Sequence, residues 1–189
     1  MKLLILDRDG VINQDSDQYI KSPAEWKPIK GSIEAIARLT QAGWRIAVAT
    51  NQSGIARGLF DMSTLNAIHD TMHKLVLQAG GRIEAIFFCP HAADAGCECR
   101  KPKPGMLHEI ERRLNVSLAG APFVGDSLKD LLAATAAGAR PILVLTGKGK
   151  KTREAGGMPE GTEVFADLAA FAANLVELRV EHRAEHRSA

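Results

Sequence analysis

Short apolar runs alternate with helical patterns along the whole chain. The apolar runs cover residues 3–6, 44–49, 83–88, 122–124 and 141–145, and residues 164–165 are a candidate edge strand. Continuous apolar runs are typical of strands that are covered on both faces of a sheet. Their alternation with helices indicates βαβ units and a parallel sheet.

Capping residues and apolar residues at intervals of three and four predict the helices between these strands. The helix that begins near Ser63, for example, has an apolar stripe and is ended by Gly80 and Gly81. Proline suits the first position of a helix, because its missing N–H would have no partner there. The predicted helix starts are Ser32, Ser63, Pro104, Ser127 and Asp167.

This order of elements predicts a three-layer, Rossmann-like α/β fold with a parallel sheet. We expect residues 1–178 to form a single domain. Residues 147–161 are rich in Gly and Lys, which predicts a mobile loop. Residues 179–189 are charged, which predicts a disordered tail.

Composition and charge narrow the range of partners. The chain has 189 residues, with 24 basic and 22 acidic side chains and a net charge of +2. Such a balance gives no electrostatic reason to expect nucleic acid as a partner. No apolar run approaches the roughly 18 residues of a membrane span, and the stretch before the first acidic residue is too short for a signal peptide. We therefore expect a cytoplasmic protein, which we take to be a monomer, with no membrane partner.

Two aspartates follow the first predicted strand, in the sequence Asp7-Arg8-Asp9-Gly10. Ligands of open parallel sheets bind beyond the carboxyl ends of the strands. Two close carboxylates repel each other unless a cation or a shared proton intervenes, and oxygen ligands suit magnesium. One carboxylate can attack phosphorus while the other transfers protons. An Asp-Gly sequence also occurs in simple turns at strand ends, so this motif alone leaves both readings open.

Three later motifs favour a catalytic role for the two aspartates over a simple turn. Hydroxyl and backbone N–H groups of residues 50–54, Thr-Asn-Gln-Ser-Gly, can hold phosphate oxygens. Lys101 can neutralise the charge of a phosphoryl group in transfer. Asp126 follows the fourth predicted strand and can complete a magnesium site, whereas Asp130 fits an ordinary carboxylate in the first turn of a helix.

With these four motifs in this order, the chain resembles the haloacid dehalogenase (HAD) superfamily of phosphohydrolases over nearly its whole length. The resemblance implies that Asp7 is the nucleophile and Asp9 the acid/base. It implies that Thr50 and Lys101 hold the phosphate. Magnesium would be bound by Asp7, Asp126 and the backbone carbonyl of Asp9. About forty residues separate Asp9 from Thr50 and about fifty separate Thr50 from Lys101, so neither gap has room for a separate cap domain.

Three cysteines and a histidine lie close together in the sequence Cys89-Pro90-His91 and Cys97-Glu98-Cys99. An odd number of cysteines in a cytoplasmic chain argues against disulfides. Four such ligands match a closed structural zinc site, although the single intervening residue is tighter than the common spacing. Zinc would order the segment that carries Arg100 and Lys101. Three free thiols and a loop histidine are the alternative.

This zinc loop before Arg-Lys-Pro resembles the heptose-bisphosphate phosphatases and the related histidinol-phosphate phosphatases. Residues 50–58 and 145–148 favour the heptose branch, which implies a small phosphorylated sugar as substrate, with the β-anomer and lipopolysaccharide-core synthesis as the expected context. In that branch residues 15–19 contact the sugar, and Arg57 and Arg100 are candidates for a second, unreacted phosphate. The residues expected to bind substrate are Arg8, Asp15, Tyr19, Asn51, Gln52, Ser53, Arg57, Arg100 and Ser127.

Two other functions stay open on the sequence alone. One is the hydrolysis of histidinol phosphate or another small phosphate ester. The other is phosphate binding without catalysis by a protein of the same fold. Turnover excludes the binding protein, and the ratio of kcat/KM between heptose bisphosphate and histidinol phosphate separates the two enzymes.

Overall fold

A computed structural model describes the backbone of residues 2–185 and the side chains of residues 2–177. Its strands are β1 (Lys2–Leu6), β2 (Trp44–Asn51), β3 (Ala85–Cys89), β4 (Pro122–Gly125), β5 (Arg140–Val144) and β6 (Glu163–Phe165). Its helices are α1 (Ser32–Gln41), α2 (Met62–Gln78), α3 (Gly105–Leu114), α4 (Leu128–Ala136), α5 (Gly149–Ala155) and α6 (Leu168–Glu185). None of the helices in the described part of the chain is both long and apolar enough to cross a membrane.

The six strands form one parallel sheet in the order β3-β2-β1-β4-β5-β6. Strands β2 and β3 lie on one side of β1, and strands β4, β5 and β6 lie on its other side. The order therefore reverses between β1 and β4, and a sheet of this kind has its ligand crevice at such a reversal. Ile5 and Leu6 pair with Phe123 and Val124 at this junction.

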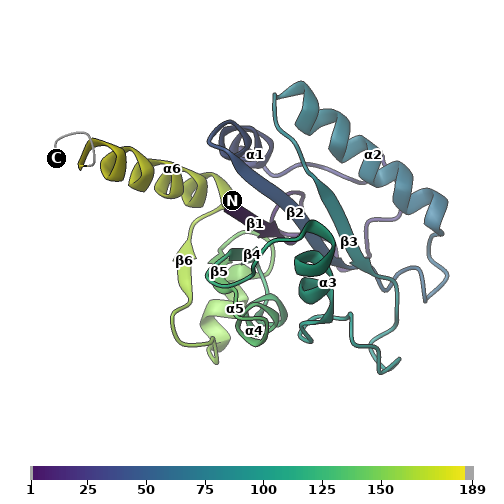
Figure 1. The fold of residues 1–189 in the computed structure, drawn as a ribbon. Coiled ribbons are helices and arrows are strands. Elements are labelled where there is room, and N and C mark those ends of the chain that lie inside the picture. The colour runs from purple at the N-terminus through teal and green to yellow at the C-terminus, as the bar shows by residue number, and fades with distance from the viewer. Residues whose placement is uncertain (1, 186–189) are drawn as a thin grey trace.

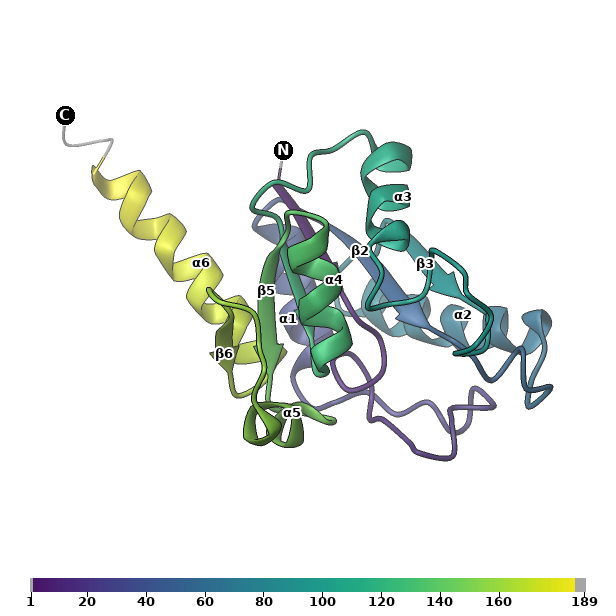
Figure 2. The same ribbon diagram turned by 90° about the horizontal axis from the view of Figure 1, so that it is seen from below.

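Alternate residues of the central strands face two separate apolar cores, as the pleat of a strand requires. Leu4 and Leu6 belong to the core beneath α1, α2 and α6, and Leu3 and Ile5 belong to the core beneath α3 and α4. Figure 1 shows α1 and α2 on one side of the sheet and α3 and α4 on the other, and Figure 2 shows the same layers from below. The predicted three-layer α/β fold is confirmed, and no inserted cap domain interrupts residues 2–185.

Two predicted helix caps are wrong. Ser32 is the first residue of α1, whose N-cap is Gly31 with φ +84°, and the Ser32 hydroxyl instead donates to the carbonyl of Val11 at 2.8 Å. Asp61 caps α2 by accepting from the backbone N–H of Thr64 at 2.8 Å, so this helix begins before Ser63. An aspartate is at least as good a cap as a serine, and it lies first along the chain.

Two segments that were expected to lack structure contain helices. Residues 149–155 form α5 inside the predicted loop, where the Thr152 hydroxyl donates to the backbone carbonyl of Asp126 at 2.9 Å. Helix α6 continues to Glu185, so residues 179–185 of the expected tail are helical. This stretch contains no proline or glycine and is rich in good helix formers. The rest of the expected tail, residues 186–189, lies outside the described residues.

Candidate active site

A polar cleft of about 420 Å³ opens at the carboxyl ends of the strands, where the strand order reverses between β1 and β4. The loop after each central strand contributes to its lining, which brings together motifs far apart in the sequence. Of the residues expected to act in catalysis or substrate binding, only Arg8 and Arg57 do not line it. The lining contains Asp7, Asp9, Asp15, Ser16, Asp17, Tyr19, Ile20, Thr50, Asn51, Gln52, Ser53, Arg100, Lys101, Asp126, Ser127, Lys129, Asp130 and Lys148.

Lys101 lies buried between two carboxylates at the floor of the cleft. Its Nζ atom is 3.0 Å from Oδ1 of Asp7, 2.6 Å from Oδ1 of Asp130 and 2.8 Å from the carbonyl oxygen of Ala49. These three contacts use all three N–H donors of the ammonium group. Burial disfavours the charged form, but Asp130 and Asp7 outweigh it and raise the pKa of Lys101, so the ammonium stays charged.

Asp126, which follows β4, is held by the turn after β5. Its Oδ2 atom accepts from the backbone N–H of Lys148 at 2.7 Å. A β-carbon on Gly10 or Gly147 would lie 2.0 Å or 2.1 Å from that same oxygen, and both glycines have positive φ. The Thr146 hydroxyl donates to the carbonyl of Gly10 at 2.6 Å and ties the two turns together. The two glycines therefore let the chain close tightly around one carboxylate.

The acidic groups of the cleft floor fit a divalent cation. Ligand oxygens of Asp7, Asp126 and Asp130 all lie within 4.8 Å of one another. Three carboxylates with one ammonium leave two negative charges, the charge that one Mg²⁺ balances. Without a cation, burial and the neighbouring carboxylates raise the pKa of Asp7, and burial with Asp130 raises the pKa of Asp126 to about 7. Asp7 and Asp126 are the residues that we expect to hold the metal.

Asp9 is held by a clamp of donors at the side of the cleft. Arg8 donates from Nε to Oδ1 at 3.0 Å and from NH2 to Oδ2 at 3.1 Å, so the pair is bidentate. Asn13 donates to Oδ1 at 2.9 Å and Gln52 donates to Oδ2 at 3.0 Å. Burial alone would raise the pKa of Asp9, but Arg8 and these hydrogen bonds outweigh it and lower the pKa. Arg8 is fully buried, so its side chain serves Asp9 and not the cleft surface.

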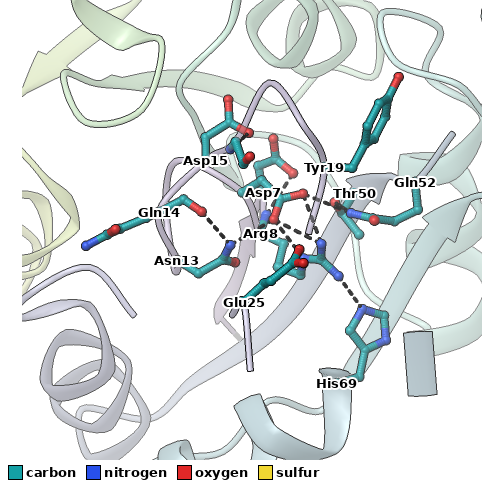
Figure 3. A network of polar contacts seen from close by, with 12 residues as sticks. Asp7, Arg8, Asn13, Gln14, Asp15, Tyr19, Glu25, Thr50, Gln52 and His69 are labelled. Carbon is teal, nitrogen blue, oxygen red and sulfur yellow. Dashed lines mark hydrogen bonds and ion pairs between the residues drawn. The ribbon is translucent and has the colours of Figure 1, made fainter. Parts of the chain in front are cut away.

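The loop after β2 is fixed to the segment that carries Lys101. The side chain of Asn51 donates to the backbone carbonyl of Lys101 and accepts from its N–H, both at 3.1 Å. The hydroxyl of buried Thr50 accepts from Gln52 at 2.9 Å, and Figure 3 shows these two side chains beside Asp7. The predicted phosphate holders Thr50 and Lys101 thus both line the cleft, on two segments that Asn51 joins.

The segment after the first motif forms the opposite rim. Asp15 and Tyr19 lie on it, as Figure 3 shows, and Lys148 fastens it by an ion pair of 2.9 Å with Asp15. Arg57 is exposed and stacks over the ring of Tyr19, with Cζ 5.9 Å from the ring centroid. Arg57 therefore lies beside a lining residue without lining the cleft, whereas Arg100 lines the cleft itself.

The four expected zinc ligands are brought together beside the cleft. The Cys89 sulfur is 3.7 Å from the Cys97 sulfur and 3.6 Å from Nδ1 of His91, which is 3.3 Å from the Cys99 sulfur. Tetrahedral zinc with Zn–S bonds of about 2.3 Å implies ligand separations of roughly 3.5–3.8 Å. Burial and the neighbouring thiols raise the pKa of Cys99 to about 12, so close thiolates need a cation between them. The residues fit a closed, four-ligand zinc site.

The structure adds residues that the sequence had not marked as functional. Asp130 is buried on Lys101, and its Oδ2 atom accepts from the hydroxyl and the N–H of Ser127 at 2.6 Å and 3.0 Å. Asp130 is the third residue of α4 after the cap Ser127, as expected for a carboxylate in the first turn of a helix. The capping box that it forms with Ser127 also holds its side chain in the active site. Lys129 and Lys148 add two cations to the cleft. The sequence predicts a mobile loop around Lys148, whereas its backbone N–H is bound to Asp126 and its side chain lines the cleft.

A parallel sheet with an aspartate cluster at its switch point and a buried lysine defines the class of HAD-like hydrolases. Comparison with known proteins agrees. A model of the HAD-hydrolase-like family matches residues 98–171. The D-glycero-β-D-manno-heptose-1,7-bisphosphate 7-phosphatase of Bordetella bronchiseptica is 63% identical over 94% of this chain and 99% of its own. The enzyme of that name from Pseudomonas putida is 58% identical over 93% of this chain and 100% of its own.

The likeness extends to three dimensions. The crystal structure of the D,D-heptose 1,7-bisphosphate phosphatase from B. bronchiseptica, complexed with magnesium and phosphate, superimposes with a TM-score of 0.92 at 63% identity. The superposition covers 94% of this chain and 99% of the chain in that crystal structure. The chain therefore belongs to the D-glycero-β-D-manno-heptose-1,7-bisphosphate 7-phosphatase family, and the resemblance drawn from its motifs is confirmed.

The glycine that supports Asp126 gives a direct test of the metal site. In Gly147→Ala the new methyl group would displace the Asp126 carboxylate. We expect the affinity for Mg²⁺ to fall about 10- to 100-fold, the usual effect of disturbing a residue that supports a metal ligand. Calorimetric titration of the zinc-loaded protein with Mg²⁺ measures it. Gly157→Ala is the matched control, because Gly157 also has positive φ, +73°, but has open space around it. Equal affinities in both variants would contradict the assignment of Asp126.

Proposed function

We propose that the chain is a magnesium-dependent phosphatase that removes the 7-phosphate of D-glycero-D-manno-heptose 1,7-bisphosphate, with preference for the β-anomer. The observation that carries the proposal is the cleft floor, where Asp7 lies against Lys101 and shares a cation site with Asp126. The names of relatives that match nearly the full chain support the substrate. Monomeric state, cytoplasmic location and a place in lipopolysaccharide-core synthesis stay predictions.

Asp7 is the proposed nucleophile. Within the described residues its side-chain contacts go to Oδ1, which accepts from the N–H of Arg8 at 2.7 Å and meets Lys101 at 3.0 Å. Oδ2 is therefore assigned to the attack: it bonds to phosphorus while the bond from phosphorus to the sugar oxygen breaks. The same contacts that fix Oδ1 hold the attacking oxygen in one orientation, which favours reaction by positioning.

Asp9 is the proposed acid/base. It protonates the departing sugar oxygen, and the resulting carboxylate then removes a proton from the water that cleaves the aspartyl-phosphate. The clamp of Arg8, Asn13 and Gln52 favours its ionised form, which is the form required for the second step. Proton donation in the first step requires at least one of these contacts to be given up.

The remaining wall residues bind the phosphoryl group. The hydroxyl of Thr50 is assigned to its oxygens, together with polar groups of residues 51–53 and Ser127, and the positive charge of Lys101 acts on them electrostatically. Magnesium, when bound by Asp7, Asp126 and the backbone carbonyl of Asp9, would neutralise charge on the transferring oxygens. Asp130 keeps Lys101 charged and in place by its contact of 2.6 Å.

Recognition of the rest of the substrate is assigned to the cleft mouth. Asp15 and Tyr19 offer hydrogen-bonding groups to sugar hydroxyls. Arg100 lines the cleft and suits the second phosphate, because a guanidinium group binds phosphate with two hydrogen bonds. Arg57, stacked on Tyr19, would act there only with a movement of its side chain. The same mouth could accept the cationic side chain of histidinol phosphate among its aspartates, which keeps that ester as the second candidate.

A structural zinc ion held by Cys89, His91, Cys97 and Cys99 completes the proposal. The packing of the four ligand atoms supports it. The last ligand is followed directly by Arg100, whose NH1 group donates to the carbonyl of His91 at 3.3 Å. Zinc would thus order the segment that presents Arg100 and Lys101, without an open position for chemistry of its own.

The function is tested by comparing substrates. We expect kcat/KM for heptose 1,7-bisphosphate to exceed that for histidinol phosphate by about 10- to 100-fold, since a second charge-assisted phosphate contact of roughly 1.5–3 kcal/mol is available only to the bisphosphate. Steady-state release of phosphate measures both. Asp7→Asn, isosteric but without a nucleophilic carboxylate, is the control and is expected to be inactive on either substrate. A preference for histidinol phosphate would replace the proposed substrate, and turnover by Asp7→Asn would overturn the mechanism.

The zinc site is tested by Cys97→Ser. Zinc content, measured by elemental analysis, should fall from about one ion per chain. The KM for the bisphosphate should rise because the segment with Arg100 loses its order, while the sheet keeps its unfolding transition. Ala95→Ser in the same loop is the control, because Ala95 is exposed and is not a ligand. A wild-type protein with no zinc and three titrating thiols would end the zinc hypothesis.

A further inference from the structure

A buried histidine lies behind the active site, and the proposed reaction gives it no role. His69 lies on the inner face of α2, among Leu65, Ile68 and Met72, and is 7% exposed. It does not line the cleft. Its Nε2 atom is 3.2 Å from NH1 of Arg8, a residue 61 positions away in the sequence. Figure 3 shows this contact reaching from the back of Arg8 to the His69 ring.

The chemistry of the pair fixes the state of the imidazole. A guanidinium group can only donate hydrogen bonds, so Nε2 of His69 must accept and the ring proton must be on Nδ1. Burial, then the charge of Arg8, lowers the pKa of His69 to about 3, so the ring is neutral. The contact is therefore a charge-assisted hydrogen bond to a neutral acceptor and not a repulsion between two cations.

The hydrogen bond to Nε2 of His69 fixes the orientation of the Arg8 side chain. A buried guanidinium needs a partner for its donors, because an unpaired buried donor costs about 1–3 kcal/mol. Arg8 is fully buried and directs its Nε and NH2 groups to Asp9, and NH1 points to the other side, toward His69. The guanidinium group of Arg8 is thus bound to Asp9 on one side and to His69 on the other. These contacts fix the plane of the guanidinium group and, with it, the plane of the Asp9 carboxylate.

We propose that His69 is a positioning residue for the proton transfers of Asp9 and acts through Arg8. The inference rests on the proposed function, since it concerns the acid/base of that reaction. His69 touches neither the substrate nor the reacting atoms. Its contribution is to hold Arg8 so that Asp9 has one orientation toward the leaving oxygen. A histidine that only fills the core would contribute packing alone.

Three substitutions of His69 separate positioning from packing. In His69→Gln the side-chain oxygen can occupy the place of Nε2 and accept from Arg8, whereas in His69→Asn the amide reaches only as far as Nδ1. His69→Leu keeps the volume and removes the acceptor. His73→Leu, one turn further along α2, is the control for helix effects, because His73 makes no contact with Arg8 among the described residues.

The decisive measurement is the dependence on the leaving group. A sugar phosphate needs a proton from Asp9 as its oxygen departs, whereas p-nitrophenyl phosphate, with a far less basic leaving oxygen, scarcely does. The value of kcat/KM reports the steps up to formation of the aspartyl-phosphate. We expect His69→Leu and His69→Asn to lose about 10-fold or more in kcat/KM with the sugar phosphate but less than about 3-fold with the aryl phosphate. His69→Gln and His73→Leu should retain both activities.

Other results of these measurements would contradict the positioning role of His69. Equal losses on both substrates would show that His69 only supports the fold, and so would failure of Gln to restore the activity that Asn loses. If His69→Leu does not fold, the Gln and Asn pair decides alone, because both are polar and of similar helix propensity within a few tenths of a kcal/mol. A wild-type protein that turns over neither substrate would instead overturn the proposed function, and this inference with it.

Discussion

The buried contacts of Lys101 with Asp7 and Asp130 are the interaction on which the rest of the site depends. An ammonium group at 2% exposure requires carboxylates around it, and two are supplied within 3.0 Å. Asp126 then brings the number of acidic groups at the floor to three. The protein's own cation balances one of them. The remaining two charges make the site a receptor for a divalent ion and, through that ion, for a phosphate group.

Topology explains why these residues meet. Asp7 and Asp126 follow the two strands at which the strand order of the sheet reverses, and Lys101 enters from a segment fixed to the end of β2 by Asn51. Asp9 is paired with its own cation, the neighbouring Arg8, and its charge also contributes to the raised pKa of Asp7.

The sequence predicts those parts of the site that follow from strand ends. Asp7, Asp9, Thr50 and Asp126 are polar residues directly after apolar runs, so a parallel sheet must place them at one edge. Asp130 is the first-turn carboxylate that its position after Ser127 predicts, but the sequence does not show that the same carboxylate also contacts Lys101. The fold was predictable for the same reason: buried parallel strands give continuous apolar runs.

Side-chain contacts between elements that are far apart in the sequence could not be predicted from it. His69 falls on the apolar stripe of α2, four residues after Leu65 and three before Met72, and only the structure shows that this face meets Arg8. Helix α5 was missed because its glycines and lysines suggest a loop. Its turn is ordered by tertiary contacts with Asp126, which periodicity does not reveal. The predicted zinc ligands Cys89 and Cys99 lie together in the structure, and this closeness was predictable because the two residues are near each other in the sequence.

The charge balance at Lys101 can be measured through thermal unfolding with and without Mg²⁺. A cation that binds only the folded state adds RT ln(1 + c/Kd), where c is the concentration of free Mg²⁺, to the free energy of unfolding, so tighter binding gives a larger rise in the unfolding temperature. Lys101→Met removes the internal positive charge while keeping an unbranched chain of similar length. The account predicts that Mg²⁺ raises the unfolding temperature of this variant by more than that of the wild type, because three carboxylates then lack any compensating cation. An equal or smaller rise in Lys101→Met would contradict it.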